Sequence, residues 1–313
     1  MFLHPHGSFD NHAADYRHIE ALPLAAAMGA EIRGVDLRRL TDEQFAEIEH
    51  ALFRHKMIFF RDQPIDHATH AAFSARFGPF AEDAYTDGVE GAREVQPLIK
   101  EADDKSAMVF GSGWHTDSPF LASPPAISTL RAIEVPPYGG DTIWCNTALA
   151  YRSLSETMRG MIANLEVRFS MRDVLASAQA HAERRDSPIG RLSATAELAE
   201  LPPTIVARVR GHVHPLVRPH PVTGELALYV DGSYAIGIEG LAPAESDALL
   251  KFLVEHITQP AFQCRLRWEP GTLTLWDNRV CIHQAFNDYQ GFRREMYRTT
   301  IAERSAVASG AAA

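Results

Sequence analysis

The stretch "FQCRLRWEPGTLTLWD" (residues 262–277) decides the fold class, because it contains two short strand-like runs separated by Pro-Gly. Similar runs recur from residue 114 onward, namely "AISTLRAIEV", "DTIWCN", "ALYVDGSY" and "REMYRTTIAE". Clusters of glycine and proline separate them. Many short strands with turn residues between them favour a mainly β protein with flanking helices, built as a β-sandwich or a jelly-roll barrel.

The N-terminal part of the chain mixes helices with single strands. The stretch "TDEQFAEIEHALFRH" (41–55) places apolar residues at helical spacing behind Thr41, which is a favourable N-cap residue. A second helix is predicted over 66–78, and "KMIFFRDQ" (56–63) is typical of a compact apolar strand. One helical insertion, over 146–165, interrupts the later strands.

Composition and missing motifs argue against several functional classes. The formal net charge of -10 makes nucleic acid or anionic membrane an unexpected partner. No apolar stretch approaches the roughly 20 residues of a membrane-spanning helix, and the N-terminus lacks the features of a signal peptide, so we expect a cytoplasmic protein. The 3 cysteines are widely spaced, which indicates a reduced compartment. The patterns G-x-x-x-x-G-K-[ST], H-E-x-x-H and G-x-S-x-G are absent, so nucleotide binding, zincin proteolysis and serine hydrolysis have no support.

A pair of candidate metal ligands lies in "GWHTDSPF" (113–120). In an extended segment, His115 and Asp117 point to the same face and can occupy two neighbouring positions of an octahedral metal. A non-haem Fe(II) centre uses two histidines and one carboxylate and leaves three positions open. His283, in "LTLWDNRVCIHQAFNDY" (273–289), offers the third ligand. Taken alone, the first pattern is more typical of a polar turn and the second of a core histidine.

In the late run "RREMYRTTIA" (293–302), alternate residues would lie on opposite faces of a strand. Arg294, Met296, Arg298 and Thr300 fall on one face of a strand. Two buried arginines without partners are costly, so either this face is exposed on an edge strand or it lies inside a barrel and meets anions. Arginine is suited to bidentate recognition of a carboxylate in the second case.

These residues, in this order, resemble the taurine dioxygenase (TauD/TfdA) family of Fe(II)- and 2-oxoglutarate-dependent dioxygenases. The resemblance covers about residues 20 to 305. It is carried by "GAEIRGVDL", "FFRDQPI", "ARFGPF", "WHTDSPF", "YGGDTIWCN", "HPLVRPHPVTG", "LYVDG", "WDNRVCIHQAFNDY" and "RREMYRTT". It implies a double-stranded β-helix (jelly-roll) core, with Fe(II) as cofactor and 2-oxoglutarate and O2 as co-substrates.

The resemblance also assigns roles to individual residues. It makes His115, Asp117 and His283 the iron ligands. Thr142, 25 positions after Asp117, and Arg294, 11 after His283, match the residues that hold the distal carboxylate of 2-oxoglutarate. Arg298, 15 after His283, matches the arginine that binds the acidic head of the primary substrate. Without the family, Thr142 is an ordinary strand-start hydroxyl, and Arg298 forms an ion pair with a nearby carboxylate.

The substrate is less clearly indicated. In taurine-specific members an acidic residue lies five positions before the first iron ligand, whereas Phe110 stands there in this chain and would not hold an ammonium group. The surrounding segments look closer to the phenoxypropionate (arylalkanoate) herbicide dioxygenases, which implies a small organic anion with an apolar or aromatic body. The candidate substrate-binding residues besides Arg298 are Phe110, Tyr85, Val109, Ser118 and Asp83. Ordinary loop packing explains each of these equally well.

We therefore expect an oxidoreductase that hydroxylates such an anion, with or without oxidative C–O cleavage, and releases succinate and CO2. An alkylsulfatase or a sulfonate/taurine-type dioxygenase is the alternative on the same centre, with Arg298 holding a sulfo group, and desaturation is a further outcome. A non-catalytic jelly-roll binding protein is disfavoured because none of the three ligands is missing.

A domain layout is expected as well. A single catalytic domain is expected over 19–305, between a flexible N-terminal tail (1–18) and a disordered C-terminal tail (306–313). An alanine- and charge-rich segment, 171–205, is a candidate substrate lid. Family members often assemble, so we expect a dimer or tetramer.

Overall fold

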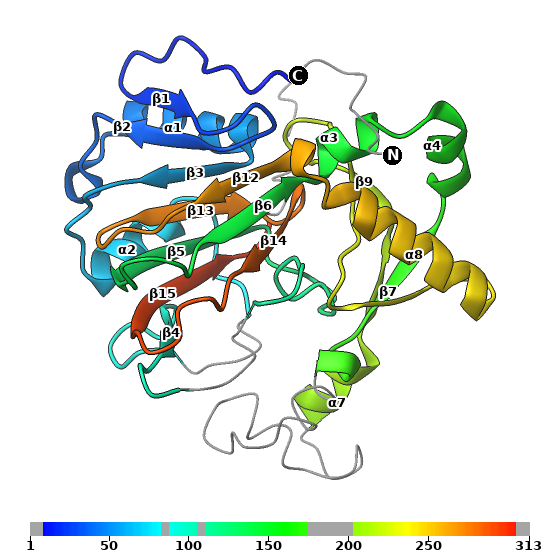
Figure 1. The fold of residues 1–313 in the computed structure, drawn as a ribbon. Helices are drawn as coiled ribbons and strands as arrows, with labels where there is room; N and C mark the ends of the chain where they lie inside the picture. Colours follow the sequence, from blue (N-terminus) through cyan, green and yellow to red (C-terminus); the bar gives the residue numbers. More distant parts are fainter. Residues whose placement is uncertain (1–8, 83–87, 105–110, 175–202, 305–313) are drawn as a thin grey trace, which may run out of the picture.

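The computed structural model describes residues 9–82, 88–104, 111–174 and 203–304, and its framework is two β-sheets facing each other (Figure 1). The larger sheet has seven strands in the order β1-β2-β3-β13-β5-β15-β4. Their bounds are β1 (Glu20–Pro23), β2 (Ala30–Arg33), β3 (Met57–Phe60), β13 (Leu273–Asp277), β5 (Ile127–Glu134), β15 (Arg294–Ile301) and β4 (Gln96–Lys100). The smaller sheet consists of β12 (Gln263–Leu266), β6 (Thr142–Asn146) and β14 (Cys281–Ala285) in that order.

Two further small sheets complete the β structure of the part of the chain that the model describes. One has the order β11-β7-β8, with β11 (Ala235–Ile238), β7 (Glu166–Phe169) and β8 (His212–Pro215), and the other pairs β10 (Leu226–Leu228) with β9 (Val217–Pro219). The prediction of a mainly β protein with a jelly-roll core and flanking helices is confirmed.

The deciding stretch 262–277 forms two strands that lie in different sheets. β12 pairs with β6 in the smaller sheet, whereas β13 pairs with β3 and β5 in the larger one. The turn between them contains Gly271, whose φ of 80° is in the left-handed region that glycine adopts without strain. The chain therefore crosses from one sheet to the other at this turn, which a flat hairpin would not do.

Each face of the larger sheet covers its own hydrophobic core. In β3 all four side chains are buried, because Met57 and Phe59 point between the sheets while Ile58 and Phe60 point towards helices on the other side. Those helices are α1 (Asp42–His55) and α2 (His67–Ala75). The barrel interior, which holds the functional site, is thus backed by a second core.

The predicted helices are largely confirmed. Thr41 caps α1 in a capping box with Gln44, as the sequence indicates. The insertion over 146–165 forms two short helices, α3 (Thr147–Arg152) and α4 (Glu156–Ile162), because the Ser155 hydroxyl accepts a hydrogen bond from Met158 N and starts a new helix. Among the described residues, two further α-helices were not predicted, α7 (Pro203–Arg210) and α8 (Pro243–Ile257). Figure 1 shows α8 on the side of the molecule opposite to α1.

Part of the expected N-terminal tail contacts the domain. The buried Asn11 donates hydrogen bonds from Nδ2 to Ala25 O (2.6 Å) and Gly29 O (2.9 Å), and its Oδ1 lies 2.6 Å from His55 Nδ1. Most of the candidate lid, 171–205, lies outside the described residues. Within the described ranges, no helix has both the length and the apolar character needed to cross a membrane.

Candidate metal centre

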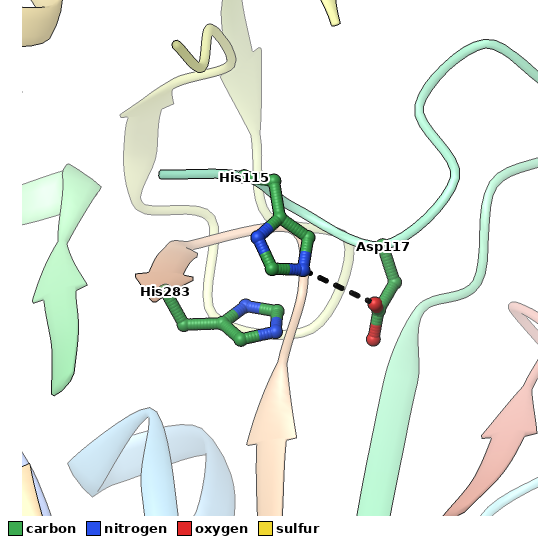
Figure 2. A group of neighbouring side chains, drawn as sticks. All are labelled: His115, Asp117 and His283. Carbon is green, nitrogen blue, oxygen red and sulfur yellow. Dashed lines mark ion pairs between the residues drawn. The ribbon is translucent and has the colours of Figure 1, made fainter. Parts of the chain in front are cut away.

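Backbone pairing brings the two predicted histidine ligands together. His115 N donates to His283 O (2.9 Å), and His283 N donates to His115 O (2.7 Å), so the segment before β5 pairs locally with β14. The two ring centroids lie 4.1 Å apart. Asp117, two residues after His115, points to the same place (Figure 2), and its Oδ1 lies 3.9 Å from His115 Nε2. Ligand atoms of all three residues lie within 4.8 Å of one another.

Hydrogen bonding and burial orient the two histidines. His115 Nδ1 lies 2.7 Å from Gly113 O, so Nδ1 donates to this carbonyl and Nε2 faces Asp117. Gly111 makes room for this ring, because a Cβ there would lie 3.1 Å from His115 Cε1. Burial, followed by the neighbouring His115, holds the pKa of His283 well below its ordinary value, so His283 is neutral. Its Nδ1 has no hydrogen-bond partner in the described part of the chain.

Asp117 supplies the negative charge that a divalent cation requires. Burial is the largest single effect and acts to raise its pKa, but Arg298, the two histidines and the hydrogen bond from Ser128 together outweigh it, and the pKa stays below its ordinary value. The carboxylate is therefore ionised although it is only 3% exposed. Two imidazoles and one carboxylate form the donor set of a non-haem Fe(II) site, so the residues present fit the metal that the sequence predicts.

Arg298 lies beside this cluster. It is buried on β15, and its Nη1 lies 3.1 Å from Asp117 Oδ1. Its Nε donates to Gln96 Oε1 on the neighbouring strand β4 (3.2 Å). β15 pairs with β5 on one side and β4 on the other, so the alternative of an exposed edge strand is wrong. Residues 294, 296, 298 and 300 are all buried, which confirms the predicted inward face.

The second predicted pair, Thr142 and Arg294, is joined by Trp268. The indole Nε1 of Trp268 donates to Thr142 Oγ1 (3.0 Å), and the Arg294 guanidinium lies 5.8 Å from the Trp268 ring centroid. Burial lowers the pKa of Arg294, and its Nε and Nη2 have no hydrogen-bond partner among the described residues. Buried guanidinium nitrogens without partners fit a site for a carboxylate.

The remaining predicted residues are less informative. Ser118 is buried directly after Asp117 and adopts a φ of 46°, in the left-handed region. Four candidate substrate-binding residues lie outside the described residues: Asp83, Tyr85, Val109 and Phe110.

Several residues around the site were missed from the sequence. Gln96 holds Arg298, Trp268 joins the two predicted co-substrate residues, and Ser128 and Asn278 surround Asp117. Only Gln96 carried a usable signal, because a polar side chain in the strand-like run "EVQPLI" (94–99) needs a buried partner.

Comparison with known proteins agrees with this geometry. The family model of the taurine catabolism dioxygenase TauD, TfdA family matches residues 20–300. An α-ketoglutarate-dependent sulfate ester dioxygenase of Pseudomonas putida is 34% identical over 91% of this chain and 89% of its own length. The (S)-phenoxypropionate/α-ketoglutarate dioxygenase of Sphingobium herbicidovorans is 31% identical over 90% of this chain and 93% of its own length.

A solved structure agrees as well. The crystal structure of a taurine dioxygenase from Burkholderia xenovorans superposes with a TM-score of 0.74, at 37% identity and with 92% of each chain covered. The family resemblance, the enzyme class and the cofactors predicted from the sequence are thus confirmed. The chain belongs to the taurine catabolism dioxygenase TauD, TfdA family and is a non-haem Fe(II)- and 2-oxoglutarate-dependent dioxygenase.

Proposed function

We propose that His115, Asp117 and His283 hold the Fe(II) of this enzyme. The observation that supports this most is the convergence of three buried ligand atoms within 4.8 Å of one another. Bound Fe(II) supplies what side chains lack, the activation of O2 for oxidation of 2-oxoglutarate to succinate and CO2 with hydroxylation of a substrate C–H bond. The protein fixes the ligands, positions both organic molecules and excludes water.

We infer that Arg294 and Thr142 bind the distal carboxylate of 2-oxoglutarate. The Arg294 nitrogens Nε and Nη2 are buried and have no partner in the described ranges, so an incoming carboxylate can accept from both. The Thr142 hydroxyl already accepts from Trp268 and keeps its own proton available for the same carboxylate.

Arg298 is the residue that selects the primary substrate. Its guanidinium is only 4% exposed and lies next to a proposed iron ligand, so a negative head group bound there places the attached carbon close to the metal. We propose a small organic anion with an apolar or aromatic body, such as an aryloxyalkanoate, as the substrate. The phenoxypropionate relative supports this class of substrate. The carboxylate of such a substrate can accept two parallel hydrogen bonds from the guanidinium of an arginine.

A sulfate ester is the second candidate substrate. The sulfate ester dioxygenase relative favours it, because a sulfate group carries the same single negative charge and can occupy the same position at Arg298. Hydroxylation of the carbon that bears the ester oxygen would give a hemiacetal-like product, which collapses to an aldehyde and inorganic sulfate. Arg298 recognises both head groups, so the apolar body has to discriminate between the candidates.

Two measurements test the proposal. Anaerobic addition of Fe(II) and 2-oxoglutarate to the purified enzyme should produce a weak visible charge-transfer band, and His115→Ala should abolish it. Succinate release is then compared across aryloxyalkanoates, alkyl sulfates and taurine. Turnover of an alkyl sulfate alone would replace the first candidate by the second. A wild-type enzyme that gives neither the band nor succinate would refute the ligand assignment.

The expected homo-oligomer, the cytoplasmic location, the single catalytic domain over 19–305 and the lid near 171–205 stay predictions. Sedimentation analysis of the full chain tests the first of these.

A further inference from the structure

The two oxygens of Asp117 have different surroundings. Oδ1 lies 3.9 Å from His115 Nε2 and 3.1 Å from Arg298 Nη1, on the side where the three ligands converge. Oδ2 accepts a hydrogen bond from the Ser128 hydroxyl at 2.5 Å. Ser128 lies on β5 and is completely buried. The two oxygens of the carboxylate therefore have different partners, His115 and Arg298 beside Oδ1 and Ser128 at Oδ2.

Asn278 determines the direction of the Ser128 hydroxyl. Its side-chain Nδ2 donates to Ser128 Oγ (2.8 Å), so this oxygen acts as an acceptor towards Asn278 and directs its own proton towards Asp117. Asn278 is itself fixed, because its Oδ1 accepts from Trp276 Nε1 (2.9 Å) and its carbonyl accepts from the Thr116 hydroxyl (2.9 Å). Its backbone N also donates to Ala126 O (2.8 Å).

This network joins three separate parts of the chain at one carboxylate. Thr116 lies between the two ligands His115 and Asp117, Ser128 lies on a central strand, and Asn278 lies in the turn between β13 and β14, where His283 follows. Every polar side-chain atom of Asn278 has a partner, and all these residues are buried. Fully connected buried networks of this kind hold a single geometry.

We propose that Ser128, oriented by Asn278, is a positioning residue that keeps Asp117 a one-oxygen metal ligand, with Oδ1 towards the metal and Oδ2 held back. This inference rests on the proposed iron site. Three protein ligands would leave the remaining positions of the metal open to 2-oxoglutarate and O2. A carboxylate free to bind through both oxygens would occupy one of those positions. Ser128 prevents this, because its hydrogen bond keeps Oδ2 on the strand side.

The test compares Ser128→Ala with two matched variants. Ser128→Thr keeps a hydroxyl at the same position. Ser74→Ala removes an equally buried hydroxyl that bonds to Thr129 and Thr299 instead of the site. Mn(II) binding to the metal-free protein is measured by isothermal titration calorimetry without co-substrate. The Fe(II)–2-oxoglutarate visible band is recorded anaerobically for each variant.

We expect Ser128→Ala to weaken Mn(II) binding by roughly tenfold or more and to shift or diminish the visible band, since partners of metal ligands typically contribute 10–100-fold to affinity. Ser128→Thr and Ser74→Ala should stay within about threefold of the wild type on that scale. If Ser128→Ala does not fold, Ser128→Cys fills the space with a weak donor and should show the same loss.

The outcomes separate this inference from the proposed function. Wild-type affinity and an unchanged band in Ser128→Ala would overturn the role of Ser128 while leaving the iron site intact. A wild-type protein that does not bind Mn(II), or a His115→Ala variant that binds it equally well, would instead refute the proposed site itself.

Discussion

Replacing Arg298 with glutamine is expected to strengthen metal binding while it weakens binding of the substrate anion. Arg298 Nη1 lies 3.1 Å from Asp117 Oδ1, the oxygen that lies 3.9 Å from His115 Nε2. A divalent cation that binds this oxygen therefore competes with a guanidinium. Glutamine removes the competing charge and can still hydrogen-bond to Gln96.

The magnitude follows from how deeply the ion pair is buried. Arg298 is 4% exposed and Asp117 is 3% exposed. Removing one partner of a buried ion pair costs about 3–5 kcal/mol, because the other charge is left uncompensated. In the variant a bound metal ion compensates the Asp117 charge again. Recovery of only about 1.4 kcal/mol of that cost upon metal binding corresponds to a tenfold tighter dissociation constant.

Calorimetric titration of the metal-free protein with Mn(II), in the absence of 2-oxoglutarate, measures this effect. The matched control is Arg294→Gln, which removes an equally buried arginine from the same face of β15 but none of the contacts to Asp117. We expect the control to bind Mn(II) as the wild type does. Urea unfolding should show that metal-free Arg298→Gln is less stable than the wild type and that saturating Mn(II) narrows the difference.

A folded Arg298→Gln protein with unchanged or weaker Mn(II) affinity would refute this reasoning. Such a result would mean that Arg298 supports the carboxylate in the metal-bound state as well, instead of competing with the metal. The same titration also tests whether metal binding and substrate binding are linked. If metal and arginine compete for Asp117, a substrate anion that engages Arg298 must raise Mn(II) affinity in the wild type, and this effect must disappear in the variant.

Three other predictions concern the co-substrate site and the acid stability of the fold. Arg294→Gln should raise the KM for 2-oxoglutarate by roughly tenfold or more, since a charged hydrogen bond contributes about 1.5–3 kcal/mol, and initial rates of succinate formation measure it. Asp277 is fully buried, accepts a hydrogen bond from Arg279 (2.6 Å) and lies 2.8 Å from His220 Nε2. The variant Asp277→Asn should therefore lower the free energy of unfolding by about 3–5 kcal/mol, measured by urea titration at pH 7. Burial opposes ionisation of Asp277, but Arg279 holds the pKa of this carboxyl in the folded state well below its unfolded value. The ionised Asp277 therefore stabilises the fold above about pH 4, and this stabilisation is lost as the pH falls further. The Asp277→Asn variant should not show this loss of stability at acid pH. Burial lowers the pKa of His70 to about 3, so the unfolded state gains a proton first and stability should fall below about pH 6.5; a His70→Gln variant should show a flatter pH profile of melting temperature between pH 6.5 and 4.

The sequence predicted those features that depend on local periodicity. The alternation in β15 placed Arg294 and Arg298 on one inward face, and the i, i+2 spacing placed His115 and Asp117 on one side of an extended segment. The spacing of apolar residues and a capping threonine predicted α1. In each case a short stretch of chain already contains the geometry.

Features that depend on pairing between distant strands could not be predicted in the same way. Nothing in 262–277 indicates that its two strands join different sheets, because that choice depends on β6 and β3, which lie more than a hundred residues away. The same holds for Ser128 and Asn278. Each reads as an ordinary strand or turn residue, and only the closed barrel brings them to Asp117. The helix α8 is a different case, since its proline start and Glu245 are a local signal for the start of a helix.

The charges of the site give one further reason to expect an anionic substrate. Asp117 contributes one negative charge, Arg294 and Arg298 contribute two positive charges, and the buried His283 is neutral. Fe(II) adds two positive charges and 2-oxoglutarate adds two negative ones, so these groups together carry an excess of one positive charge. An excess charge in a buried site is unfavourable unless a partner compensates it. A monoanion at Arg298 restores neutrality, whereas a zwitterion such as taurine would bring its own positive charge and leave the excess in place. Carboxylates and sulfate monoesters both meet this requirement. The distinction among substrates should therefore follow net charge first and the shape of the apolar body second, and a panel of neutral, zwitterionic and monoanionic compounds with the same body would reveal that order.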